Sequence, residues 1–302
     1  MRLRLKLGWK IVLYAFLILV TTITFIPLLY TVAASFKTNF EIMAGGVSPI
    51  PNNLLKLFSG EATLRDFFQN YIDVFSGNGA WIGEKGTFLD YTLNSIFVGV
   101  MASFLVVLFT SMSAYAFQRG HFPGQKILYW TFMATMFIAA GSVTMYPLLR
   151  ITTKLNMNNL FGVAIVQWGT AGAANLFLTM GYLKSISTEL DQAARIDGCS
   201  FFSTWYRIIL PLSVPILGTI ALMTFRSSWN AYLMPKLMLI KNQELSTLVV
   251  AVVKLQSMGG AGASQYNLMM AGTMLAVLPM IILFIVMNRT FVEGITAGAV
   301  KG

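Results

Sequence analysis

The sequence predicts an all-α membrane protein with about six transmembrane helices. Hydrophobic residues make up 56% of the chain and charged residues only 11%, whereas a soluble domain carries about 25% charged residues. Apolar runs close to the ~20 residues that cross a bilayer recur along the chain. The 11 acidic residues all fall outside these runs, in keeping with the cost of a carboxylate in hydrocarbon. The predicted spans are Ile11–Tyr30, Leu93–Phe117, Ile127–Leu149, Leu160–Leu183, Ile208–Phe225 and Met269–Met287.

The first apolar run follows the basic segment 1–10 and could be taken for a signal peptide, with Val32–Ser35 as its cleavage site. The run is longer than the apolar core of a signal peptide, which has about 7–15 residues. We therefore expect an uncleaved helix, so that residues 1–34 form a cytoplasmic N-terminus and the first span.

Positive charge sets the predicted orientation. The N-terminal segment carries Arg2, Arg4, Lys6 and Lys10 without an acid, and such segments stay on the cytoplasmic side. With about six spans the C-terminus is cytoplasmic as well. Residues 35–92 then form an extracytoplasmic cap, which we expect to be folded because it is rich in aromatic residues. Residues 93–302 form the transmembrane core domain, with a polar loop at 189–211 and a cytoplasmic tail at 288–302.

The sequence lacks the residues that several classes of protein need for their function. The sequence has no phosphate-binding loop of the G-x-x-x-x-G-K-[ST] type. With one histidine and one cysteine, no metal cluster of imidazoles and thiolates can form. No predicted span holds the carboxylate that an ion-coupled carrier buries. We expect no catalytic residue and no cofactor, and the energy for any uphill transport would come from another subunit. The net charge of +10 requires no nucleic acid, because anionic lipid headgroups account for it.

The polar loop reads ELDQAARIDGCSFFSTWYRIILP, from Glu189 to Pro211. Its pattern predicts a short helix over Glu189–Ile196, a break at Gly198, and a second helix that starts at Phe201. Glycine suits the break because it adopts the positive φ of a helix C-terminus without steric cost. We expect a helix–turn–helix finger on the cytoplasmic face, with Ala193 and Ala194 forming a smooth docking side. An amphipathic interfacial loop is the alternative.

The finger resembles the EAA motif of ABC importer membrane subunits, which reads Glu-Ala-Ala, three residues, Gly, nine residues, and Ile-x-Leu-Pro. The matching residues here are Gln192-Ala193-Ala194, Gly198 and Ile208–Pro211, with Gln192 in place of the usual glutamate. The ending Gly294–Gly302 is similar to that of the maltose-transporter subunit of the G type. Further segments similar to the carbohydrate-uptake branch are Ser35–Lys37, Pro49–Pro51, Asn70–Phe75, Leu93–Ser95, Ala114–Lys126 and Trp229–Pro235.

The resemblance implies a multi-pass permease subunit of the cell inner membrane, in an ATP-driven importer for a sugar or oligosaccharide. Such an importer contains a homologous second permease subunit, two ATPase subunits that hold ATP and Mg, and an extracytoplasmic solute-binding protein. The finger, between predicted spans 4 and 5, would be the coupling helix, and the tail would reach between the ATPase subunits. The implied coupling residues are Gln192, Ala193, Ala194, Asp197 and Gly198, and the implied tail contacts are Ala297, Gly298, Lys301 and Gly302.

Six residues are candidates for contact with the substrate. Sugar sites use aromatic faces with amide or hydroxyl groups, and candidates on or near the spans are Gln167, Asn175, Arg226, Trp229, Asn230 and Tyr232. If Arg226 lies deep, its guanidinium would suit an acidic, uronate-containing oligosaccharide; the alternative is that it snorkels to the interface. The other classes that remain are a secondary carrier and a membrane receptor or scaffold, neither of which would need a co-expressed ATPase.

Overall fold

Every regular element in the described part of the chain is a helix. The computed structural model describes residues 7–45, 48, 50–77, 86–137, 141–256 and 264–299, and of 287–299 it describes the helical backbone alone. The chain divides into two compact units, Met1–Phe88 with Val252–Val277 and Leu89–Ala251 with Leu278–Gly302. The longer helices are α1 (Leu7–Ser35), α6 (Phe88–Arg119), α9 (Leu160–Thr170), α10 (Gly172–Leu183), α14 (Val214–Trp229) and α17 (Tyr266–Ala299).

Three of these helices are long and apolar enough to cross a membrane unbroken: Gly8–Ser35, Phe88–Arg119 and Tyr266–Val286. They coincide with the first, second and sixth predicted spans, which are therefore confirmed as continuous apolar helices. Two bent helix pairs raise the number of candidate spans among the described residues to five. The predicted number of about six is therefore not confirmed by the described residues.

The bent pairs coincide with the fourth and fifth predicted spans. α9 and α10 meet at Ala171 with a bend of 58°. Phe201–Leu212 and α14 meet at Ser213 with a bend of 77°. Pro211 precedes the second bend by two residues, and the five residues Trp205–Ile209 before it form a π-helix. Proline removes a backbone donor and clashes with the preceding turn, which accounts for the local widening and the change of direction.

The third predicted span, Ile127–Leu149, is divided in the structure. Its residues belong to α7 (Gln125–Ala134), the short 3-10 helix η1 (Gly141–Thr144) and α8 (Met145–Lys154), while residues 138–140 lie outside the described part. Neither α7 nor α8 is long enough to be a candidate span. The apolar run also contains Gly141 and Pro147, residues that interrupt helices, so apolar composition alone overestimated its continuity.

In the first unit, the predicted folded cap consists of short helices. They are α2 (Asn39–Met43), α3 (Asn52–Ser59), α4 (Leu64–Phe67) and α5 (Gln69–Ser76). Capping boxes begin α2 and α4: Thr63 and Asp66, for example, exchange side-chain and backbone hydrogen bonds. The two bonds that Thr63 donates to the Asp66 carboxylate lower the pKa of Asp66. Phe36 stacks on Phe67, with ring centroids 4.4 Å apart, so aromatic packing accounts for the order of this segment.

Two asparagines tie the cap to the start of α17. Asn39 donates to the Ser264 carbonyl at 2.6 Å and accepts from the Tyr266 backbone N–H at 3.0 Å. Asn70 accepts a bond of 2.8 Å from the Asn267 amide, and its own amide donates to the carbonyls of Ser35 and Lys37. The cap is therefore fixed to its unit by amide hydrogen bonds as well as by apolar packing.

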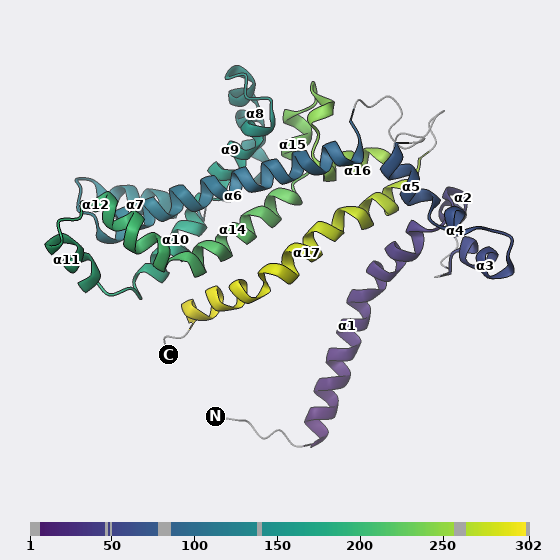
Figure 1. Cartoon of the computed structure of the whole chain (residues 1–302), viewed down its shortest axis with the longest axis horizontal. Coiled ribbons are helices and arrows are strands. Elements are labelled where there is room, and N and C mark those ends of the chain that lie inside the picture. Colours follow the sequence, from purple (N-terminus) through teal and green to yellow (C-terminus); the bar gives the residue numbers. More distant parts are fainter. Residues whose placement is uncertain are drawn as a thin grey trace. The chain divides into compact units, whose positions relative to one another are not determined.

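The second unit is organised along α6, which contributes to three apolar clusters from its N-terminal half to its C-terminal end. The first cluster joins α6 to α9 and α15 (Leu233–Met238), and the second joins it to α14. The third joins it to α7, α10 and the π-helix, and Figure 1 shows α7, α10 and α12 (Phe201–Thr204) around that end of α6.

The contact of α6 with α14 depends on small residues one turn apart. A Cβ on Gly99 would lie 2.7 Å from the Phe225 ring, and the Ser103 hydroxyl donates to the Ala221 carbonyl at 3.1 Å. Small residues at this spacing let membrane helices approach closely.

Candidate functional site

The predicted finger is present as a helix, a tight turn and a second helix. α11 (Glu189–Ile196) ends in a Schellman motif, in which Cys199 N–H donates to Ala194 O at 2.8 Å and Gly198 N–H donates to Arg195 O at 3.1 Å. Gly198 has φ +78°, the left-handed conformation that glycine adopts without strain. Ser200 then caps α12 by accepting from Ser203 N–H. The positive φ predicted for Gly198 is confirmed.

The two faces of α11 differ. Gln192, Ala193 and Asp197 are exposed, and Ile196 is 87% exposed. Ala194 is only 2% exposed and packs toward the rest of the unit. Adjacent helical residues point about 100° apart, so Ala193 and Ala194 lie on different faces of α11. The expectation that they form one docking side is therefore wrong. The outward face instead combines Gln192, Ala193 and Ile196.

A buried polar network joins α11 to the end of α6. The Asp191 carboxylate is 3.1 Å from Arg119 Nε and accepts a hydrogen bond of 3.0 Å from the Tyr115 hydroxyl. Arg119 Nη2 also donates to the Ile186 carbonyl at 2.6 Å. Asp191 is 8% exposed, so the carboxylate is removed from water and held by two partners on one helix. Any displacement of α11 relative to α6 must stretch these bonds.

The predicted tail contacts are only partly described. The backbone of α17 is helical through Ala297 and Gly298, to Ala299. Lys301 and Gly302 lie outside the described residues.

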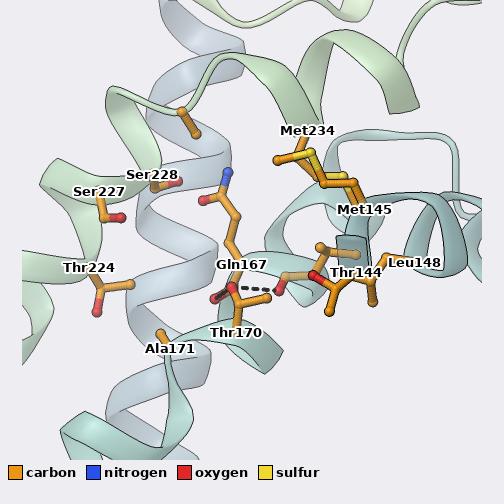
Figure 2. A pocket seen from close by; sticks show the side chains of 12 residues that line it. Thr144, Met145, Leu148, Gln167, Thr170, Ala171, Thr224, Ser227, Ser228 and Met234 are labelled. Carbon is orange, nitrogen blue, oxygen red and sulfur yellow. Dashed lines mark hydrogen bonds between the residues drawn. The ribbon is translucent and has the colours of Figure 1, made fainter. Parts of the chain in front are cut away.

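A second candidate site lies at the α9–α10 bend. A pocket of about 340 Å³ opens between this bend, α14 and the start of α8. Its size is within the range of about 300–1,000 Å³ that is common for ligand pockets. Figure 2 shows the Gln167 side chain extending between the hydroxyl side chains of α14 and the methionines Met145 and Met234. The residues that line the pocket are Thr144, Met145, Leu148, Val166, Gln167, Thr170, Ala171, Thr224, Ser227, Ser228, Ala231 and Met234.

Polar atoms in this pocket lack partners within the protein. Both the amide nitrogen and the amide oxygen of Gln167 are buried without a hydrogen-bond partner in the described residues, and so is the hydroxyl of Ser228. Ser228 is 5% exposed. A buried polar group without a partner costs about 1–3 kcal/mol, so such groups usually have a function or a partner outside the chain.

Of the predicted substrate-path residues, Gln167 alone lines this pocket. Asn175 is buried, and its side-chain amide donates to the Ala171 carbonyl, one turn earlier, at 2.9 Å. Trp229 is 2% exposed and stacks with Phe225 at 5.8 Å.

The other three lie near the C-terminal end of α14 and are not among the residues that line the pocket. The Asn230 amide donates a hydrogen bond of 2.9 Å to the Arg226 carbonyl, and the Tyr232 hydroxyl accepts a hydrogen bond of 2.7 Å from Lys236 Nζ. Arg226 is exposed and is not among the residues that line the pocket. Its side chain therefore lies outside the pocket lining.

Sequence reasoning missed the network and most of the pocket. Tyr115 and Asp191 lie 76 residues apart, and no local pattern connects them. The hydroxyls on α14 did leave a signal, because Thr224, Ser227 and Ser228 recur at helical spacing on one face. No group of three or more potential metal ligands occurs among the residues that the structure describes.

Comparison with curated proteins finds relatives over nearly the whole chain. The arabinooligosaccharides transport system permease protein AraQ of Halalkalibacterium halodurans is 29% identical, over 98% of this chain and 97% of its own length. The probable starch degradation products transport system permease protein AmyC of Thermoanaerobacterium thermosulfurigenes is 32% identical over 96% of both chains. The maltodextrin transport system permease protein MdxG of Bacillus subtilis is 27% identical, over 97% of this chain and 96% of its own length.

The fold also has a solved counterpart. A chain in the crystal structure of a bacterial ABC transporter involved in the import of the acidic polysaccharide alginate matches with a TM-score of 0.74. It is 23% identical, and the match covers 94% of this chain and 96% of that one. The model of a protein family described as the binding-protein-dependent transport system inner membrane component matches residues 64–296, well over half of the chain. The chain therefore belongs to this family of inner-membrane transport components.

Proposed function

We propose that this inner-membrane permease subunit forms half of the translocation path of an ATP-driven importer for a sugar or oligosaccharide. Its partners in this proposal are a homologous second permease subunit, two ATPase subunits and an extracytoplasmic solute-binding protein. The names of its relatives, which are oligosaccharide and starch-product permeases similar over nearly their full length, support this assignment. As a permease subunit the chain is not an enzyme; ATP and Mg would bind to the partner ATPase.

The observation that carries the coupling role is the two-sided character of α11. Its outward face presents a polar amide, a small side chain and an exposed apolar side chain from Gln192, Ala193 and Ile196, and in this proposal a cleft of the ATPase subunit covers them. Its inward face holds Asp191 in the network with Arg119 and Tyr115. A pull exerted on the outward face would therefore pass through charge-assisted bonds to α6, a candidate membrane span.

This role requires the finger and both termini to be cytoplasmic, and therefore also requires that the segment with α7, η1 and α8 supplies a sixth crossing between α6 and α9. The basic N-terminal segment supports that orientation. The tail from Ala297 to Gly302, rich in small residues, would then reach the ATPase subunits. Deleting the chain from Ala297 onward should lower coupled transport while the permease still assembles, and unchanged transport would refute the tail contact.

Gly198→Asp tests the docking role of the finger. The variant places a charged side chain at the turn, where a Cβ meets no atom of this chain within 4 Å, so within the chain it adds only the backbone strain of a non-glycine residue at φ +78°. We expect the complex to remain in the membrane while ATP hydrolysis no longer drives uptake. Gly124→Asp is the matched control, because Gly124 has φ +79° and equally open space. Normal sugar-stimulated ATPase activity in Gly198→Asp, with the complex intact, would overturn the assignment.

The alternatives predict different energetics. A secondary carrier would transport without a co-expressed ATPase and would stop when the proton or sodium gradient collapses. A receptor or scaffold would not transport at all. Uptake that depends on the ATPase and survives collapse of the ion gradients would support the importer.

A further inference from the structure

We infer that the pocket at the α9–α10 bend binds an uncharged, hydroxyl-rich segment of the substrate, and that Gln167 and Ser228 determine this specificity. The inference rests on the proposed function and adds the chemical class that the path selects. It assigns direct substrate contact to this chain, on one face of α14 and one turn of α9.

The first argument is the hydrogen-bonding capacity of the pocket. Gln167 brings an amide that both donates and accepts, and Ser228 brings a hydroxyl that does the same. These atoms are buried and have no partner within the described residues. A sugar hydroxyl is likewise donor and acceptor, so it satisfies both groups without needing a charge. Thr170, by contrast, already donates to the Val166 and Gln167 carbonyls and retains acceptor capacity only.

The second argument is the pocket's charge. No residue that lines it is charged, and its apolar wall consists of aliphatic and thioether side chains from α8, α9 and α15. A carboxylate that enters such a site loses its hydration without gaining a cation, which is strongly unfavourable. Arg226, the nearest cation in sequence on α14, is exposed and does not line the pocket. The lining therefore favours neutral sugars over uronates.

The third argument is location. The pocket lies where a candidate span is broken, with Thr170 and Ala171 at the bend itself. Irregular backbone at membrane depth is tolerated where it lines a cavity. Asn175 bonds to the Ala171 carbonyl at this bend, and the Gln167 side chain, one turn before it, lines the cavity.

The test uses the complete importer, with its ATPase and binding protein, in membrane vesicles or cells. The probes are neutral trisaccharides (maltotriose, arabinotriose and galactotriose) and two uronates (trigalacturonate and trimannuronate). The variants are Gln167→Leu, Gln167→Glu and Ser228→Ala. Gln118→Glu and Gln118→Leu are matched controls, because Gln118 is on α6 and does not line the pocket.

We expect the wild type to take up a neutral trisaccharide and neither uronate. Gln167→Leu should raise the KM for uptake of the neutral sugar by about tenfold, because it leaves a sugar hydroxyl unpaired in the pocket. Ser228→Ala should also raise the KM for the neutral sugar, by a smaller factor. Gln167→Glu should lower uptake of the neutral sugar and should not allow uptake of the uronates. The Gln118 controls should retain the wild-type KM.

Three results would overturn the inference while the proposed function stands: preferred uptake of a uronate by the wild type, an unchanged KM in all pocket variants, or an equal rise in the Gln118 controls. ATP-dependent uptake of none of the probes, by wild type in an intact complex, would instead count against the proposed function and remove the basis of the inference.

Discussion

Two buried polar clusters of the same unit behave in opposite ways. At the end of α6, the Asp191 carboxylate has two partners on one helix: Oδ1 accepts a hydrogen bond from the Tyr115 hydroxyl, and Oδ2 is ion-paired with Arg119 although it accepts no hydrogen bond from the described residues. At the α9–α10 bend, the Gln167 amide and the Ser228 hydroxyl are buried with no partner among the described residues. A buried ion pair with a hydrogen bond holds two helices in a fixed relation, whereas a buried polar group without any partner destabilises the protein until a ligand or another subunit bonds to it. The contrast distinguishes two roles. The cluster of Asp191, Arg119 and Tyr115, called the joint below, connects α11 to α6, and the cluster of Gln167 and Ser228 forms a binding surface.

Breaking the joint should have the largest effect. Asp191→Leu leaves Arg119 buried without its counter-ion, and Arg119→Met does the converse, which we expect to destabilise the fold by about 3–5 kcal/mol. The double variant Asp191→Leu/Arg119→Met should recover much of that loss, since no charge is left buried alone. The thermal unfolding midpoint of the purified complex measures both. A double variant less stable than either single variant would show that the two residues do not act as a pair.

The packing of α14, the helix that brings Thr224, Ser227 and Ser228 to the pocket, can be disturbed without touching a polar group. Gly99→Ala would place a Cβ 2.7 Å from the Phe225 ring, and this ring is stacked on the buried Trp229. We expect a loss of about 1–3 kcal/mol from the strained contact between α6 and α14. Gly181→Ala is the control: a Cβ at this helical position meets nothing within 4 Å, so alanine should stabilise by up to ~1 kcal/mol. Equal melting temperatures for the two variants would contradict close α6–α14 packing.

Arg226 gives the smallest expected effect. Because its side chain is exposed outside the pocket lining, Arg226→Gln should leave uptake of the neutral trisaccharides unchanged and should not alter the exclusion of uronates. Uptake of both classes by wild type and variant measures this. Selective loss with the acidic sugar would show that the guanidinium faces the translocation path.

The sequence allowed the long helices to be predicted because apolar length alone specifies them, as in α1, α6 and α17. It did not reveal the bends at Ala171 and Ser213, because hydropathy measures how apolar a segment is and contains no information on where the helix axis changes direction. The third predicted span is not continuous because an apolar run that contains Gly141 and Pro147 need not form one helix.

The same division holds for the candidate sites. The turn at Gly198 was predictable because a Schellman motif is specified by a few adjacent residues. Gln167 was also identified, because an amide within an apolar run is conspicuous. The pairing of Asp191 with Arg119 and Tyr115 was not predictable, since it joins residues far apart in the chain. For the same reason the inward direction of Ala194 became evident only once α11 was packed.

One pair of quantities tests the distinction between joint and binding surface most directly: the KM for sugar uptake and the number of sugar molecules imported per ATP hydrolysed. Both are measured in the reconstituted complex with Gln167→Leu and with Asp191→Asn. We expect Gln167→Leu to raise KM and leave the transport ratio unchanged, and Asp191→Asn to lower the ratio and leave KM unchanged. If both variants alter the same quantity, or if Asp191→Asn alters KM alone, the two clusters do not have the separate roles assigned to them.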